Sequence, residues 1–117
     1  MSDVKVEAGA CGFTSMIHVT KIDRKTVEVT INSPCVMIQS FNKALGTLPW
    51  MKVFAKIKDS EIFQAAQDNI SHTDCPVPVA VLKAIMVEMG AALPKNASIV
   101  FQTGPEETEA SLLSQDN

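Results

Sequence analysis

Alternation of hydrophobic and polar residues is clearest in the first third of the chain. Residues 26–31 place three aliphatic side chains on one side and two threonines and a glutamate on the other. This period of two predicts a half-buried strand. Residues 13–22 are rich in β-branched residues and contain no glycine or proline, which is typical of a strand. With a short turn at 23–25, the stretch 13–31 predicts a β-hairpin.

Two further segments have strand-like composition. Residues 4–7 alternate valine with charged residues, although this run is short. Residues 97–102 form an apolar run with two adjacent β-branched residues, just before an acidic end. We expect the segment 97–102 to be a C-terminal strand in the same sheet as the hairpin.

Three segments between these strands have the spacing of helices. The first begins at Ser33-Pro34, because serine can cap a helix and proline suits its first position. It continues over 36–45, with apolar residues at helical spacing and a glycine at its end. The second begins at Asp59 or Ser60 and extends to about residue 70. The third opens at Cys75-Pro76 and extends to about residue 89. Its expected apolar stripe consists of Val79, Leu82, Met86 and Met89.

The order of the elements predicts an α+β fold. We expect a two-layer sandwich, in which a small, mostly antiparallel sheet packs against three helices. The sheet would contain the β-hairpin 13–31 and the C-terminal strand 97–102. Residues 1–103 form a single domain in this interpretation. Residues 104–117 contain four acidic residues and no lysine or arginine, and we expect them to be an acidic disordered tail.

Composition and charge exclude several classes of function. Among 117 residues, 46% are hydrophobic and 20% are charged, so one ordinary core can form without disulfides. The net charge of -3 comes mostly from the acidic tail, and the nearly neutral body has no basic stripe for nucleic acid. No apolar run approaches the ~18–20 residues of a membrane span. The first residues lack the apolar region of a secretion signal. We therefore expect a cytoplasmic protein, and an edge strand in so small a sheet would allow a homodimer.

The candidate chemistry lies in three separated cysteines. Cys11 lies between two glycines, and Cys35 and Cys75 each follow or precede a proline at a predicted helix start. Free backbone N–H groups and the helix dipole at such a start favour thiolate and lower the thiol pKa. Thiolate is the form that binds metals or attacks electrophiles. His72 precedes Cys75 by three residues, a separation that can bring both side chains to one site.

Three hypotheses for function follow from these residues. In the first, Cys11, Cys35 and Cys75 bind a metal ion or an iron–sulfur cluster, and His72 either is the fourth ligand or leaves one position open; three thiolates and an imidazole suit zinc or such a cluster. Its partners would be proteins that donate or accept metal or sulfur. No Cys-x-x-Cys is present, so the usual zinc-ribbon and ferredoxin patterns are absent.

The second hypothesis is a sulfur carrier or thiol enzyme. Cys75 would be the nucleophile that bears a persulfide, with His72 as its base. The third hypothesis is a non-catalytic interaction module whose cysteines only pack, since free cysteine is among the most buried residue types. The metal-binding and sulfur-carrier hypotheses differ in whether function requires all three cysteines or Cys75 alone.

Several motifs extend these hypotheses by resemblance. Most of the chain, roughly residues 4–102, resembles a family of small uncharacterised proteins from anaerobic bacteria and archaea. The motifs that carry this resemblance are Ala8-Gly9-Ala10-Cys11-Gly12-Phe13, Ile31-Asn32-Ser33-Pro34-Cys35, His72-Thr73-Asp74-Cys75-Pro76-Val77-Pro78 and Ala92-Leu93-Pro94-Lys95-Asn96. The family implies no particular chemistry.

Two further resemblances each imply a role for the cysteines. The layout of Cys11, Cys35 and Cys75 is similar to that of TSCPD domains, which implies a shared three-cysteine site for a metal. Thr73-Asp74-Cys75-Pro76 stands where those domains have Ser-Cys-Pro. Locally, Cys75-Pro76-Val77-Pro78 resembles the Cys-Pro-x-Pro element of TusA-type sulfur carriers, which implies that Cys75 carries a persulfide. Those carriers are shorter and have the motif near their start.

Overall fold

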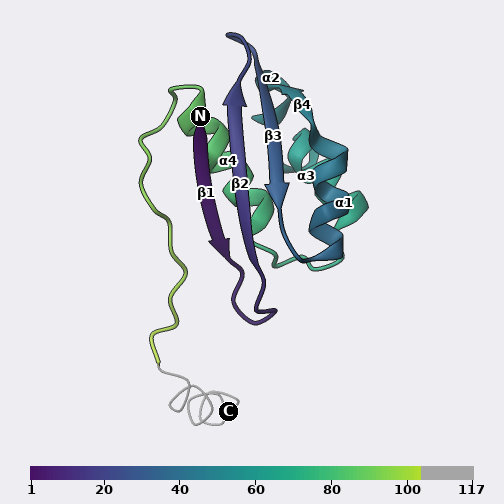
Figure 1. Cartoon of the computed structure of the whole chain (residues 1–117), viewed down its shortest axis with the longest axis vertical. Helices are drawn as coiled ribbons and strands as arrows, with labels where there is room; N and C mark the ends of the chain where they lie inside the picture. Colours follow the sequence, from purple (N-terminus) through teal and green to yellow (C-terminus); the bar gives the residue numbers. More distant parts are fainter. Residues whose placement is uncertain (104–117) are drawn as a thin grey trace.

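The computed structural model describes residues 1–103 and contains one antiparallel sheet covered on one side by helices (Figure 1). The sheet has the order β1-β2-β3-β4. Its strands are β1 (Ser2–Glu7), β2 (Thr14–Lys21), β3 (Thr26–Asn32) and β4 (Thr47–Pro49). The helices are α1 (Val36–Leu45), α2 (Trp50–Val53), the 3-10 turn η1 (Ile57–Asp59), α3 (Glu61–Asn69) and α4 (Val77–Glu88). The predicted α+β, two-layer architecture is confirmed.

The predicted hairpin is present as β2 and β3. Ile17 pairs with Ile31 and Val19 with Val29, so the aliphatic residues of both strands lie on the same face. The turn closes where the Asp23 carboxylate accepts a hydrogen bond from the Lys25 N–H at 2.8 Å. The alternation in the sequence set this register, because a slip by one residue would turn the aliphatic face to water.

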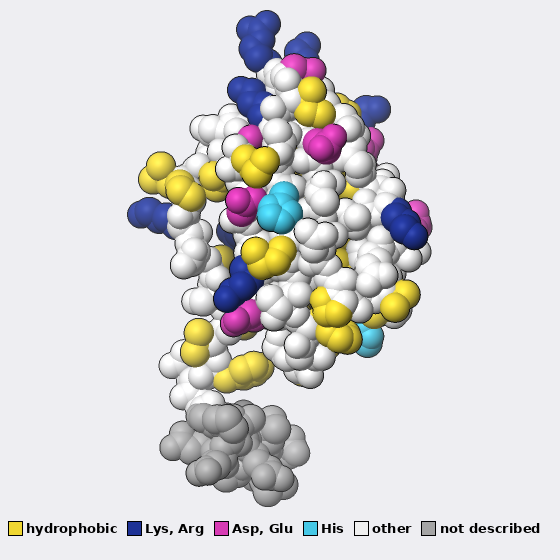
Figure 2. Space-filling view, in the orientation of Figure 1, with side chains coloured by type: hydrophobic (Ala, Val, Ile, Leu, Met, Phe, Trp, Pro, Cys, Tyr) yellow, Lys and Arg dark blue, Asp and Glu magenta, His cyan; other side chains and the backbone are white. Residues whose placement is uncertain are grey.

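The core lies between the sheet and the helices. Phe41 of α1, Ile62 of α3 and Ile85 of α4 are fully buried against the inner face of the sheet. The predicted apolar face of α1 is correct, since Ile38, Phe41 and Leu45 are its buried residues. The opposite face of the sheet is open, and Figure 2 shows charges of both signs interspersed over it.

The two edges of the sheet differ. The β3 edge is closed by β4, by the Gly46 carbonyl, which accepts from the Val29 N–H at 2.9 Å, and by the Asn42 side chain, which accepts from the Ile31 N–H at 2.8 Å. At the other edge, β1 pairs with β2 alone among the described strands. Its outward backbone groups therefore have no strand beside them within residues 1–103.

Helix α4 packs behind β1 and β2, and one carboxylate fixes its end to both strands. Glu88 accepts hydrogen bonds from the Ser2 hydroxyl at 2.9 Å and from the Lys21 N–H at 2.8 Å. The amino group of Met1 lies 3.1 Å from the same carboxylate. Because the end of α4 lies at the start of β1, the start of α4 lies near the opposite end of the sheet.

The predicted strand at 97–102 is wrong, because this segment pairs with no strand in the described range 1–103. After Gly90 the chain leaves α4, runs in the same direction as β1 and continues past the tip of that strand (Figure 1). The composition of 97–102 suits a strand, but pairing also requires a free edge within reach. The sheet instead contains β1, longer than the run predicted at 4–7, and the short β4.

The predicted stripe of α4 does not face the sheet. The helix buries Val77, Pro78, Val81, Ala84 and Ile85. Val79 of the predicted stripe is 46% exposed and Met86 is half-buried, whereas Leu82 and Met89 are half-buried and pack against the margin of the core. Periodicity failed here because α4 is apolar on nearly every side, which leaves the choice of inner face to tertiary packing.

Smaller differences concern the helix start and the chain end. Helix α1 begins at Val36 rather than Ser33, and Cys35 occupies its N-cap position. The Ser33 hydroxyl is used instead by the Cys35 N–H at 3.1 Å and the Ser15 hydroxyl at 2.8 Å. The acidic tail predicted for 104–117 lies outside the described residues. In the part of the chain that is described, no helix has the length and apolarity needed to cross a membrane.

Candidate thiol site

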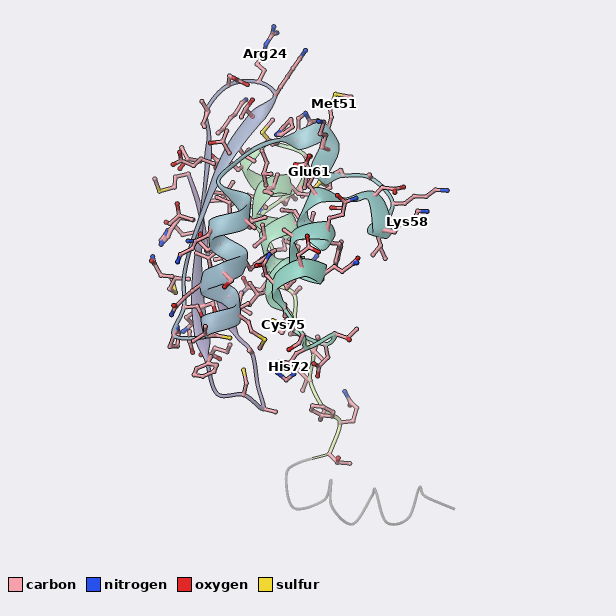
Figure 3. The ribbon with its side chains drawn as sticks, turned by 90° about the vertical axis from the view of Figure 1, so that its right-hand side faces the viewer. Arg24, Met51, Lys58, Glu61, His72 and Cys75 are labelled. Carbon is pink, nitrogen blue, oxygen red and sulfur yellow. The ribbon has the colours of Figure 1, made fainter. Side chains whose placement is uncertain are left out.

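Sheet topology brings the three cysteine-bearing segments to one end of the molecule. The turn from β1 to β2 contains Cys11, and β3 leads into Cys35 at the same end because neighbouring strands are antiparallel. The start of α4 brings Cys75 to this end as well. Figure 3 shows Cys75 and His72 at the end of the protein opposite Arg24, which lies in the turn from β2 to β3.

Cys11 lies in the exposed turn between β1 and β2. Gly9 and Gly12 have φ angles of 89° and 76°, a conformation that residues with a Cβ rarely adopt. The turn is closed by hydrogen bonds from the Gly12 N–H to the Gly9 carbonyl at 2.9 Å and from the Ala8 N–H to the Phe13 carbonyl at 3.1 Å. The glycines therefore shape the turn that presents the Cys11 thiol to solvent.

Cys35 lies at the start of α1, as the sequence predicted. Its carbonyl accepts the first helical hydrogen bond, from the Gln39 N–H at 3.0 Å. The side chain is half-buried and packs against the edge of the core. Burial on one side leaves the thiol only partly open to solvent.

Cys75 lies directly before the start of α4. Its N–H donates to the His72 carbonyl at 3.1 Å, which closes a turn over residues 72–75. The Val77 N–H donates to the Cys75 sulfur. A sulfur contact also ties this loop to α1, because the Ser71 hydroxyl lies 3.1 Å from Met37 Sδ. No pattern in the sequence predicts the contact between Ser71 and Met37, which are 34 positions apart in the chain.

The surroundings of Cys75 raise its pKa above the ordinary value. Burial of the thiol has the largest effect, and the charges that Cys35, Cys11 and Asp74 would carry raise the pKa further. Only the Val77 N–H, at the helix start, opposes this change. The prediction that the helix start lowers the pKa of Cys75 is therefore wrong: desolvation outweighs a single backbone donor.

The three cysteines lie at the same end of the protein. Cys11 and Cys35 both act on Cys75, although the three are separated by 24 and 40 positions in the sequence. All three are free thiols. The thiols therefore form a loose cluster, called here the thiol cluster (Cys11, Cys35 and Cys75).

The thiol cluster is not a closed metal cage. Within residues 1–103, no three Cys, His, Asp or Glu side chains are arranged to hold a metal ion. His72 is exposed, and it takes part in the turn before Cys75 through its carbonyl rather than its ring. Any shared ligand would require the thiols to approach one another.

Comparison with known proteins identifies a family and no activity. Residues 2–101 match a family of unknown function, DUF6951. No curated protein matches the chain, and no solved structure matches it. The expected similarity to a domain of unknown function is thus supported, whereas the likeness to TSCPD domains and TusA-type carriers stays a prediction. The match spans nearly all of the described residues, so the chain belongs to the family of unknown function DUF6951.

Proposed function

We propose that the thiol cluster binds a soft metal ion, zinc or the iron of an iron–sulfur cluster, through Cys11, Cys35 and Cys75. The observation that carries this proposal is the convergence of three cysteine-bearing segments at one end of the sheet, where Cys35 and Cys11 both act on Cys75. Once ionised, these thiols would repel one another. A bound cation reverses that effect, because it replaces the protons and attracts all three sulfur atoms.

The raised pKa of Cys75 disfavours this residue as a nucleophile in the metal-free protein. Nucleophilic attack and persulfide formation require thiolate, and burial with a nearby carboxylate favours the protonated thiol of Cys75. No lysine or arginine is among the groups that shift the pKa of Cys75. A soft metal overcomes this difficulty since it deprotonates coordinating thiols outright.

Assembly of the site would use the two half-buried cysteines as its fixed part. Cys35 and Cys75 are held by their helix starts and by the core. The exposed glycine turn would then bring Cys11 over the metal. Three thiolates leave one position of a tetrahedral zinc site, which His72 or an exchangeable ligand would fill. An exchangeable fourth ligand would suit a protein that passes metal or a cluster to a partner.

The test is binding of Co²⁺, as a spectroscopic probe for Zn²⁺, to the reduced full chain under anaerobic conditions. We expect one Co²⁺ per chain, with sulfur-to-cobalt charge-transfer absorption that Zn²⁺ abolishes. Each of Cys11→Ser, Cys35→Ser and Cys75→Ser should weaken binding by more than the roughly 10–100-fold that loss of an outer-shell partner costs. Met37→Leu is the matched control, because it removes a sulfur atom at the same end of the protein but no thiol.

The outcomes separate this proposal from its alternatives. If Co²⁺ and Zn²⁺ fail to bind while all three thiols are reduced, the metal site is refuted. A sulfur carrier becomes the better hypothesis if Cys75 alone accepts a persulfide; the N–H of Val77 directed at its sulfur is the feature that favours it. If neither occurs, the interaction module with packing cysteines is left.

A further inference from the structure

The thiol cluster combines one exposed cysteine with two half-buried ones. Cys11 is exposed in the turn between β1 and β2, whereas Cys35 and Cys75 are half-buried and pack against the margin of the core. All three are free thiols. A reagent in solution therefore meets the Cys11 thiol first, and the other two thiols lie closer to the core.

Hydrogen bonds connect the strand after the Cys11 turn to Cys35. The Ser15 hydroxyl, near the start of β2, donates to the Ser33 hydroxyl oxygen at 2.8 Å. The same oxygen accepts a hydrogen bond from the Cys35 N–H at 3.1 Å. Because Ser15 is buried, this connection is shielded from water. The start of α1 is thus fixed beside the strand that follows Cys11.

Cys75 is held in the same region by α4 and by the loop before this helix. Helix α4 packs against β1 and β2, the two strands that the Cys11 turn connects. The Ser71 hydroxyl lies 3.1 Å from Met37 Sδ, which ties the loop before Cys75 to the first turn of α1. Cys35 and Cys11 both act electrostatically on Cys75. Two thiols held by the core therefore share a neighbourhood with one exposed thiol.

This arrangement suits a bond between two sulfur atoms. Within residues 1–103, no three ligating side chains are already arranged around a metal ion. A disulfide needs only two cysteines to approach, with their Cα atoms about 4.4–6.8 Å apart. Formation of one disulfide therefore demands a smaller rearrangement than assembly of a three-thiolate site.

We propose that the thiol cluster is a redox switch, in which a low-molecular-weight disulfide joins Cys11 to one of the two half-buried cysteines. With oxidised glutathione as the reagent, the Cys11 sulfur bonds to one glutathione sulfur, and the reagent's own disulfide bond breaks. The first glutathione leaves with the proton of the Cys11 thiol. The half-buried thiol then attacks the Cys11 sulfur, and the second glutathione leaves with its proton. Two protein thiols are oxidised, and one glutathione disulfide is reduced to two glutathione molecules.

The consequence of this switch for metal binding rests on the proposed function. Only thiolates bind the metal, so a disulfide removes two of the three ligands and leaves one. The reduced protein should bind Co²⁺, the oxidised protein should not, and a thiol reductant should restore binding. The state of the thiols would then decide whether the protein holds or releases its metal.

The test is the intact mass of the full chain after incubation with oxidised glutathione, without oxygen and with a chelator present, followed by peptide mapping. We expect a monomer that has lost two hydrogen atoms, carries no glutathione and has its disulfide at Cys11. Cys11→Ser should abolish this product under conditions that convert all of the wild type. The double variant Cys35→Ser/Cys75→Ser should stop at the mixed disulfide of Cys11 with glutathione. Met37→Leu is the matched control and should react like the wild type.

Several results would overturn the switch. One is a wild type that stops at the glutathione adduct, because no second thiol then reaches Cys11. Others are an internal disulfide that joins Cys35 to Cys75, or disulfides that form only between chains. The metal site is judged separately. A reduced protein that binds no Co²⁺ refutes the proposed function and leaves the switch standing, whereas Co²⁺ binding without an internal disulfide on oxidation refutes the switch alone.

Discussion

The carboxylate of Glu88 offers the sharpest test of how the two layers are joined. It accepts two hydrogen bonds, from the Ser2 hydroxyl and the Lys21 N–H, and lies 3.1 Å from the amino group of Met1. Its side chain is only 10% exposed. Glu88→Gln retains the size and one acceptor but removes the charge. We expect this variant to loosen the end of α4 from β1 and β2.

The contacts set the magnitude of this effect. A hydrogen bond to a charged group contributes about 1.5–3 kcal/mol, and water reaches the partner groups on the surface, so the lower end applies. We expect Glu88→Gln to lower the free energy of unfolding by about 2 kcal/mol, or the melting temperature by roughly 8 °C for a domain of this size. Chemical denaturation measures the free energy of unfolding and a thermal scan measures the melting temperature, both followed by circular dichroism.

The pH dependence identifies the charge as the cause. The Lys21 N–H, the Ser2 hydroxyl and the terminal amino group hold the pKa of Glu88 below its ordinary value of 4.5. The stabilisation is therefore complete above that value and is lost as pH falls through the lower pKa of the folded protein. Wild type and Glu88→Gln should converge in acid. Glu7→Gln is the matched control, because its pair with Lys5 is exposed and contributes little. A loss that is independent of pH, or equal in both variants, would refute this reasoning.

Three further predictions concern the core and the thiols. Phe41→Ala, at a fully buried position, should destabilise the fold by about 3–5 kcal/mol in denaturant titrations. Ser60→Ala should lower stability by about 1–3 kcal/mol in the same assay, because the buried Ser60 hydroxyl donates to the Val53 carbonyl, which would lose its partner. Since the folded protein raises the pKa of Cys75 above 9.0, wild type should lose stability above about pH 9 more steeply than Cys75→Ala. Parallel alkaline curves for the two proteins would contradict that cause.

Local periodicity was enough to predict the elements whose two sides differ. Strand β3 alternates aliphatic with polar residues, and α1 spaces Ile38, Phe41 and Leu45 along one side. In both, only one orientation buries the apolar face, so the pattern determines register and facing. The hairpin and the first helix followed from the sequence for this reason.

Elements whose two sides do not differ in polarity could not be predicted from periodicity. Helix α4 is apolar on both sides, so periodicity could not show which side packs on the sheet. The side with Val81 and Ile85 is buried, and the predicted stripe lines a groove. Residues 97–102 have the composition of a strand, but the path of the chain after Gly90 carries them past β1. The three-residue β4 pairs because α1 returns the chain beside β3, which no local pattern reveals.

For the cysteines, the sequence predicted the positions but not the direction of the pKa shift. The positions of Cys35 and Cys75 at helix starts followed from the neighbouring prolines. The direction in which the pKa of Cys75 moves did not follow, because it depends on burial and on two cysteines far away in the sequence. A helix start alone is a poor guide to thiol reactivity when the sulfur is partly desolvated.

The proposal that Cys11, Cys35 and Cys75 act as one site is tested most directly by their reactivity with a maleimide, counted by mass spectrometry with and without one equivalent of Zn²⁺. If they bind one ion together, all three thiols should react in the metal-free protein and all three should be protected at the same zinc concentration. Protection of none, or of Cys75 alone while Cys11 and Cys35 react at unchanged rates, would contradict a shared site.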